Sequence, residues 1–144
     1  MTAFVDTSVL VAAFYADHEH RAESFDLLQR HKRRELSCAA HSLADFDATV
    51  TTMPGVKRVS PAEAVLHLGD LAQRLTPVPV SAAEYLNAAG LAAASGAASG
   101  DIFDALIGTA FEKSKAKCFY TWNLRQFQRL SGKIGDRVRI PSLK

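Results

Sequence analysis

The stretch Ala3-Phe4-Val5-Asp6-Thr7-Ser8 decides the fold class, because it joins an apolar strand to the polar start of a helix. Four more short apolar runs follow along the chain, and helical patterns separate them. The predicted strands cover residues 3–6, 36–39, 76–80, 117–121 and 137–141. Alternation of this kind predicts an α/β fold around a mostly parallel sheet of about five strands.

Capping signals mark the starts of two predicted helices. Ser60-Pro61-Ala62-Glu63 has an N-cap serine, a proline at the first helical position and a glutamate that closes a capping box, and Ser81-Ala82-Ala83-Glu84 repeats the box. The other predicted helices cover residues 8–16, 20–33, 42–53, 101–115 and 124–130. The Ala/Ser/Gly-rich stretch at 92–100 predicts a loop, and residues 1–144 are interpreted as a single domain.

Composition limits the function classes only weakly. The net charge of +2 is too small to attract nucleic acid through a global field, so an anionic substrate requires local patches or a metal ion. The longest uncharged run, residues 85–100, is too poor in large apolar side chains for a membrane span, and the start of the chain lacks the basic region of a signal peptide. We therefore expect a cytoplasmic protein, in which Cys38 and Cys118 are buried thiols without a function.

Polar side chains follow the predicted strands where a parallel sheet binds ligands, at the carboxyl ends. Asp6 stands at the end of the first strand, and Thr121 and Asn123 stand at the exit of the fourth. Asp6 alone is equally well explained as a helix cap. A catalytic interpretation of this edge therefore depends on other acidic residues nearby.

Further acids stand at helices that follow strands. Asp45 and Asp47 lie in the helix after the second strand, and Asp101 and Asp104 lie at the start of a later helix. A solvated helix face explains any one of these acids taken alone, and the helix dipole also explains Asp101. Grouped carboxylates repel one another unless a cation neutralises them, so their convergence predicts a site for Mg²⁺ or Mn²⁺.

Zinc is a weaker prediction. The cysteines are not placed to bind a metal, and the histidines are scattered along the chain. His18 and His20 stand near a predicted helix start, where solvation or capping explains them better than metal binding.

Four motifs in order resemble those of PIN domains. Phe4-Val5-Asp6-Thr7-Ser8-Val9-Leu10 is similar to the opening motif, and His41-Ser42-Leu43-Ala44-Asp45 with Thr51-Thr52-Met53-Pro54 is similar to the segment of the second acid. Asp104-Ala105-Leu106-Ile107 resembles the third motif, and Thr121-Trp122-Asn123-Leu124-Arg125-Gln126-Phe127 resembles the fourth. Each motif is weak alone, but their order over the full length is a specific signal, and the VapC toxin branch fits best.

This resemblance implies a PIN-like three-layer α/β/α sandwich and a metal-dependent endoribonuclease, the toxin of a type II toxin–antitoxin pair. The implied catalytic residues are Asp6, Asp45, Asp104 and Asn123, of which the three aspartates hold Mg²⁺, with Mn²⁺ as the other candidate. The implied supporting residues are Thr7, Ser8, Asp101 and Thr121. The implied partners are RNA, an antitoxin that blocks the acidic cleft, and a second copy of the chain.

Two positions depart from the family pattern. The second acid is usually glutamate, so Asp45 reaches a metal only through a backbone shift or a bridging water. Asp47 projects about 200° away around the same helix, which favours Asp45. Asn123 is neutral where other PIN domains have a carboxylate, and we expect one firmly bound metal ion.

Candidate RNA contacts are basic. Arg125 and Arg129 follow the fourth motif, whereas the run at 30–34 is explained slightly better as a solvated face. Trp122 either stacks on a base or packs in the core.

Two other functions compete with a ribonuclease. A phosphatase with Asp6 as nucleophile is disfavoured, because Ser8 stands where such enzymes have a second aspartate. A catalytically impaired PIN-like module that binds RNA or protein stays open, because both Asp45 and Asn123 depart from the family pattern.

Overall fold

The computed structural model describes residues 2–94, 101–130 and 132–143, without the side chain of Asp101. The strands are β1 (Ala3–Val5), β2 (Leu36–Ala39), β3 (Thr76–Val78), β4 (Cys118–Tyr120) and β5 (Val138–Arg139). The helices are α1 (Thr7–Phe14), α2 (Arg21–Gln29), α3 (His41–Thr51), α4 (Pro61–Arg74), α5 (Ala82–Ala94), α6 (Asp101–Ser114), α7 (Leu124–Gln128) and α8 (Gly132–Gly135), and two 3₁₀ turns cover Arg33–Glu35 and Gly55–Lys57. Every strand lies within a predicted range.

The five strands form one sheet in the order β3-β2-β1-β4-β5, and all four pairings are parallel. The chain extends the sheet from β1 to β3 and then returns to the other side of β1 for β4 and β5. The strand order therefore reverses between β1 and β4, and ligands bind at the carboxyl ends of strands at such a point.

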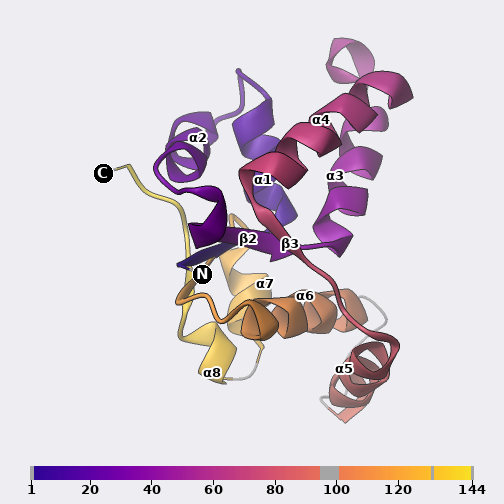
Figure 1. Ribbon diagram of the computed structural model, residues 1–144, viewed down its shortest axis with the longest axis vertical. Coiled ribbons are helices and arrows are strands. Elements are labelled where there is room, and N and C mark those ends of the chain that lie inside the picture. The colour runs from indigo at the N-terminus through magenta and orange to yellow at the C-terminus, as the bar shows by residue number, and fades with distance from the viewer. Residues whose placement is uncertain (1, 95–100, 131, 144) are drawn as a thin grey trace.

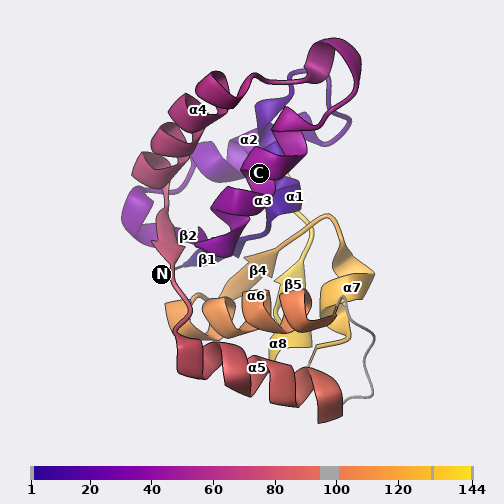
Figure 2. The ribbon, with the colours of Figure 1, turned by 90° about the vertical axis from the view of Figure 1, so that its right-hand side faces the viewer.

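Helices cover both faces of this sheet (Figures 1 and 2). Helices α1 to α4 lie on one face, and α5 to α8 lie on the other. Successive side chains of β1 point to opposite faces, so Ala3 and Val5 join the core under the first layer, and Phe4 packs with Phe111 and Phe119 in the second. The predicted α/β/α sandwich is confirmed.

The predicted capping box at Ser81 is complete, whereas at Ser60 the Glu63 carboxylate accepts the hydroxyl of the serine instead of its backbone N–H. The Ser60 hydroxyl accepts the backbone N–H of Glu63 at 3.2 Å and begins α4. Before α5, the Ser81 hydroxyl accepts the Glu84 N–H at 3.2 Å, and the Glu84 carboxylate accepts the Ser81 N–H at 2.8 Å. These bonds satisfy backbone donors that the first turn of a helix leaves without partners.

Three local predictions differ from the structure. Helix α2 ends at Gln29 instead of residue 33, because the backbone N–H of Lys32 donates to Glu35 and closes a 3₁₀ turn before β2. The alanines at 92–94 continue α5, as their high helix propensity favours, and residues 95–100 of the predicted loop lie outside the described part. Helix α8 was not predicted, since four residues carry too little periodicity.

The two cysteines are free thiols in different environments. Cys38 is buried in β2 as predicted, and burial raises the pKa of its thiol to about 12. Cys118 is only partly buried, which corrects the prediction for that residue. Among the described helices, none combines the length and the apolar run that crossing a membrane requires.

Candidate active site

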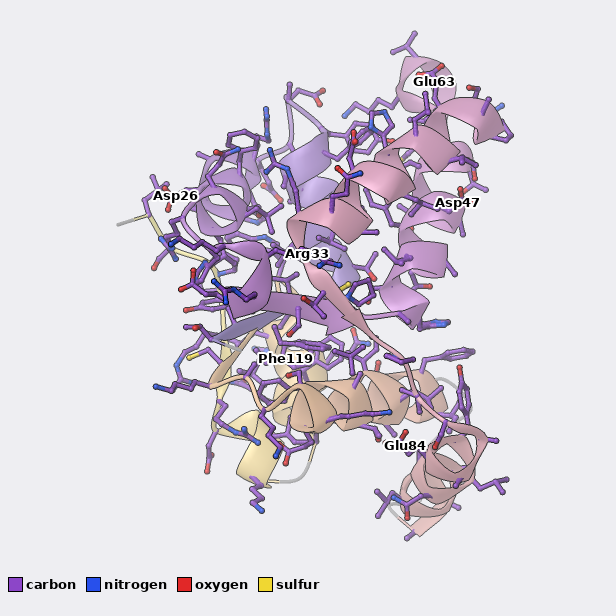
Figure 3. The ribbon with its side chains drawn as sticks, in the orientation of Figure 1. Asp26, Arg33, Asp47, Glu63, Glu84 and Phe119 are labelled. Carbon is purple, nitrogen blue, oxygen red and sulfur yellow. The ribbon has the colours of Figure 1, made fainter. Side chains whose placement is uncertain are left out.

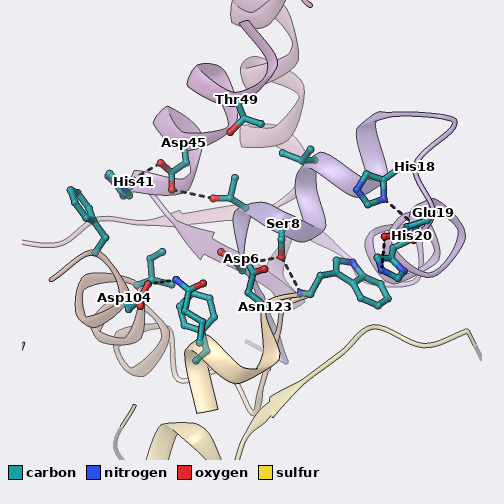
Figure 4. Close-up of a pocket in the computed structure, with 17 residues that line it drawn as sticks. Asp6, Ser8, His18, Glu19, His20, His41, Asp45, Thr49, Asp104 and Asn123 are labelled. Carbon is teal, nitrogen blue, oxygen red and sulfur yellow. Dashed lines mark hydrogen bonds and ion pairs between the residues drawn. The ribbon is translucent and has the colours of Figure 1, made fainter. Parts of the chain in front are cut away.

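A cleft of about 740 Å³ opens at the carboxyl edge of the sheet, where the strand order reverses (Figure 4). Side chains from the exit of β1, from α1, α3, α6 and α7, and from the segments after α1 and β4 reach it. Its described lining consists of Asp6, Thr7, Ser8, Val11, His18, Glu19, His20, His41, Asp45, Thr49, Phe103, Asp104, Ile107, Trp122, Asn123, Gln126 and Phe127. Six of these residues were predicted as site residues: Asp6, Thr7, Ser8, Asp45, Asp104 and Asn123. A seventh predicted residue, Thr121, lies outside the described lining but donates a hydrogen bond to the Asp6 carboxylate.

Asp6 lies at the centre of the cleft because β1 is the central strand. Its backbone N–H donates to the carbonyl of Tyr120 at 3.1 Å, which continues the β1–β4 ladder by one residue. The Asp6 carboxylate therefore lies beside the carboxyl end of β4. Asp6 is only 4% exposed.

Two hydroxyl groups hold the Asp6 carboxylate. Ser8 Oγ and Thr121 Oγ1 each donate to Asp6 Oδ2 at 2.8 Å. The same oxygens accept backbone N–H groups after β4: Ser8 Oγ from Trp122 at 3.0 Å, and Thr121 Oγ1 from Asn123 at 2.9 Å. Each hydroxyl therefore both donates and accepts, which fixes the orientation of the carboxylate.

Burial raises the pKa of the Asp6 carboxyl above its ordinary value, although the hydrogen bonds from Thr121 and Ser8 lower it in part. The charged form is therefore costly in this position without a nearby cation. A positively charged ligand in the cleft would offset that cost.

Asp104 approaches the cleft from α6 and is also buried. The Gln126 amide, on α7, donates to Asp104 Oδ1 at 2.5 Å. Gln126 was not predicted as a site residue. The available signal was its place in the fourth motif, but a contact across 22 residues is set by helix packing. Asp101 begins the same helix, and its side chain lies outside the described part.

Asp45 lies on α3 at the other side of the cleft and is held less firmly. Its side chain is 46% exposed, Thr7 Oγ1 donates to its Oδ2 at 3.5 Å, and His41 Nε2 lies 3.6 Å from its Oδ1. Asp47 points outward from α3, away from the sheet (Figure 3). The structure therefore places Asp45 in the cleft and Asp47 outside its described lining.

The segment between α1 and α2 closes one end of the cleft, which the sequence analysis did not foresee. Figure 4 shows His18, Glu19 and His20 there, with Asp6 and Asn123 between them and the His41 end. The His20 ring stacks on Trp122 with centroids 3.8 Å apart. His18 Nδ1 accepts the backbone N–H of His20 at 3.0 Å, directly before α2, although no described side chain caps the helix itself.

The proposed arginine contacts lie outside the described lining of this cleft. Arg125 and Arg129 are exposed on α7, and Arg129 lines a second groove of about 950 Å³ between α5, α6, α7 and α8. The basic run at 30–34 leads into the start of β2, at the opposite edge of the sheet. There Arg30 pairs with Asp26 and also donates to the Ser142 carbonyl.

The donor chemistry of the cleft fits a hard divalent cation. Asp6, Asp45 and Asp104 supply carboxylate oxygens and Asn123 an amide oxygen to one space, and such ligands suit Mg²⁺ or Mn²⁺. In the described part of the chain, no three histidine, cysteine or acidic side chains already lie within one coordination shell. Binding therefore requires side-chain adjustment or bridging waters, as the short Asp45 side chain predicts.

Comparison with known proteins places the chain in a family. The model of the PIN domain family matches residues 3–133, which is most of the sequence. This chain belongs to the PIN domain family. A search of curated protein sequences found no match.

Several solved structures share its fold. They include VapBC2 from Rickettsia felis, bound to a DNA fragment from their promoter, with a TM-score of 0.66, 17% identity, and 99% of this chain and 100% of that chain covered. VapC20 from Mycobacterium tuberculosis, a Sarcin-Ricin loop cleaving toxin, has a TM-score of 0.65, 17% identity and coverage of 85% and 90%. FitAcB from Neisseria gonorrhoeae has a TM-score of 0.62, 17% identity and coverage of 98% and 97%. The PIN fold implied by the motifs is confirmed.

Proposed function

We propose that this PIN domain is a metal-dependent endoribonuclease and the toxin of a type II toxin–antitoxin pair, acting on cytoplasmic RNA. One observation carries the proposal: carboxylates from three separate elements meet in one cleft where the strand order reverses. Asp6 comes from the end of β1, Asp45 from α3 and Asp104 from α6.

The roles of the side chains follow from their contacts. Asp6 and Asp104 are the principal ligands, because both are buried and held by neutral donors, and Asp45 completes the set directly or through water. Ser8 and Thr121 orient Asp6, and Asn123 contributes a neutral oxygen. When bound, Mg²⁺ (or Mn²⁺) lowers the pKa of a coordinated water and neutralises charge on the phosphoryl oxygens.

The proposed partners come from the solved structures with this fold. VapC20 is named as a Sarcin-Ricin loop cleaving toxin, and VapBC2 is described as bound to a DNA fragment from their promoter. We propose that a small antitoxin binds this chain and covers the acidic cleft with a basic side chain. The chain itself is proposed to form a homodimer.

A second candidate function is a catalytically impaired PIN module that binds RNA or protein. The contacts of Asp45 with His41 and Thr7, together with the neutral Asn123, favour it. Both features weaken the attraction of the cleft for a second cation.

Cleavage of total cellular RNA separates these candidates. Purified protein, freed of any partner, is incubated with Mg²⁺, with Mn²⁺ and with chelator, beside Asp6→Asn and the matched control Asp47→Asn. Discrete fragments that require metal, vanish with Asp6→Asn and persist with Asp47→Asn would support the ribonuclease. Absence of cleavage by folded protein under every condition would favour the binding module.

A further inference from the structure

An exposed aromatic ring stands in the cleft beside the acids. Phe103 is 51% exposed, although it is the immediate neighbour of the buried Asp104 on α6. Leaving a phenylalanine ring half in water forfeits much of the free energy that its burial would provide. The packing of α6 is met by other residues, including Ile107, Ala110 and Phe111, so folding does not explain the position of this ring.

The ring of His41 stacks on the ring of Phe103. The two rings stack with centroids 5.6 Å apart and planes 23° from parallel. His41 also lies 3.6 Å from the Asp45 carboxylate, one helical turn further along α3. The stacked pair therefore joins α3 to α6 at the end of the cleft where two of the acids lie, and it presents an aromatic surface there.

The charged side chains of the cleft contribute little to the binding of an RNA strand. Its described lining includes Asp6, Glu19, Asp45 and Asp104 but neither lysine nor arginine. Phosphate groups therefore gain little from side-chain cations here, in contrast to most nucleic-acid grooves. Bases can supply the missing affinity, because every base has a flat face that stacks on an aromatic ring.

We propose that the His41–Phe103 pair is a stacking platform for an unpaired nucleobase next to the scissile phosphate. The inference rests on the proposed function, since it names a subsite of that same cleft. An unpaired strand is required, because a base within a duplex keeps its faces covered by its neighbours. A strand that crosses the acids would meet a second pair of stacked rings, His20 and Trp122, at the opposite end.

Binding of two RNA oligomers tests the platform without knowledge of the natural target. One is oligoadenylate, and the other is an abasic ribose–phosphate oligomer of the same length. Both are titrated into the protein in chelator, so that nothing is cleaved and the contribution of phosphates is the same. The wild type should bind oligoadenylate about tenfold or more tightly than the abasic oligomer.

Three variants locate the effect. Phe103→Leu keeps an apolar side chain but removes the ring, and it should remove most of the preference for oligoadenylate while leaving the abasic oligomer unaffected. Phe103→Trp should retain the preference. Tyr85→Leu is the matched control, because Tyr85 is an exposed aromatic ring (45%) on α5, outside the described lining of the cleft.

The proposal is overturned if the wild type shows no preference for bases, or if Phe103→Leu keeps that preference. It is also overturned if Phe103→Leu loses antitoxin binding while RNA binding is unchanged, which would assign the ring to a protein interface. Cleavage with metal is scored separately. If the protein cleaves RNA but Phe103→Leu does not change binding, only the proposed stacking platform is contradicted. If the base preference depends on Phe103 but no RNA is cleaved, only the proposed ribonuclease activity is contradicted.

Discussion

The two sides of the acidic cleft are built differently. On the sheet side, Asp6 is 4% exposed and two hydroxyls donate to one of its oxygens at 2.8 Å. On the α3 side, the Asp45 side chain is 46% exposed, and its contacts with Thr7 and His41 are 3.5 Å and 3.6 Å long. The sheet side therefore fixes the orientation of the Asp6 carboxylate before a ligand binds, whereas the Asp45 carboxylate on the α3 side is held less firmly and can adjust to a ligand.

This contrast assigns different tasks to the two acids. A buried carboxylate with a raised pKa costs stability, and a protein keeps such a group where function requires it. An exposed carboxylate near a histidine, such as Asp45, costs little stability and contributes less to the binding of a cation. We expect changes on the sheet side to affect cleavage far more than changes on the α3 side.

Asp6→Asn should have the largest effect. The amide keeps the shape of the side chain and an oxygen that accepts the Ser8 and Thr121 hydroxyls, but it removes the charge that holds a cation. We expect cleavage to fall by at least about a hundredfold, the range seen when one key electrostatic group is removed. Initial rates on RNA with saturating Mg²⁺ measure this. Activity within a few-fold of the wild type would contradict the assignment of Asp6.

Thr121→Val should come next. Valine fills the same volume but can neither donate to Asp6 nor accept the Asn123 N–H. Groups that orient a metal ligand typically contribute about 10- to 100-fold, and the apparent affinity for Mg²⁺ should fall with the rate. Thr52→Val is the matched control, because that exposed hydroxyl donates only to carbonyls of α3. Equal rates for the two variants would mean that the orientation of Asp6 is unimportant.

Asp45→Ala should have a smaller effect, a loss of about tenfold, because a partly exposed ligand that acts through water is more easily replaced by solvent. Asp47→Ala, on the outer side of the same helix, should leave the rate unchanged. Asp45→Glu should retain or raise activity, since it restores the reach of the usual acid. Parallel kinetics of the three variants test this order. A loss with Asp45→Ala as large as that with Asp6→Asn would remove the contrast between the two sides.

The smallest effect concerns stability against pH. Burial raises the pKa of Asp6 in the folded state, so the folded protein binds its proton more tightly than the unfolded chain does. In chelator, the contribution of Asp6 to the free energy of unfolding should therefore fall as pH rises above the ordinary value of 3.8. Urea unfolding of the wild type and Asp6→Asn at several pH values measures this. The variant should be the more stable at neutral pH, and the gap should close in acid. A gap that widens in acid would contradict the sign.

The fold was predictable because its signals are local. Alternating apolar runs and helical patterns give the strands. The serine caps at Ser60 and Ser81 begin two helices as predicted, and at Ser81 the reciprocal bond from its N–H to Glu84 is also present. The position of Asp6 at a strand end was equally local. That the neighbouring strand is β4, with Thr121 beside Asp6, depends on strand order, which sequence periodicity does not encode.

The missed parts of the cleft come from contacts distant in sequence. The bond from Gln126 to Asp104 joins α7 to α6, and the stack of His20 on Trp122 joins residues about a hundred positions apart. Phe103 was missed for a different reason. An apolar residue in a helix is expected to face the core, and only its exposed fraction indicates another role.

Titration of Mg²⁺ into metal-free wild type and Asp6→Asn, followed by calorimetry, tests most directly whether the convergent acids form a cation site. We predict one binding event in the wild type, with a raised melting temperature, and loss of both in the variant. No binding by the folded wild type, or equal binding by the two proteins, would contradict it.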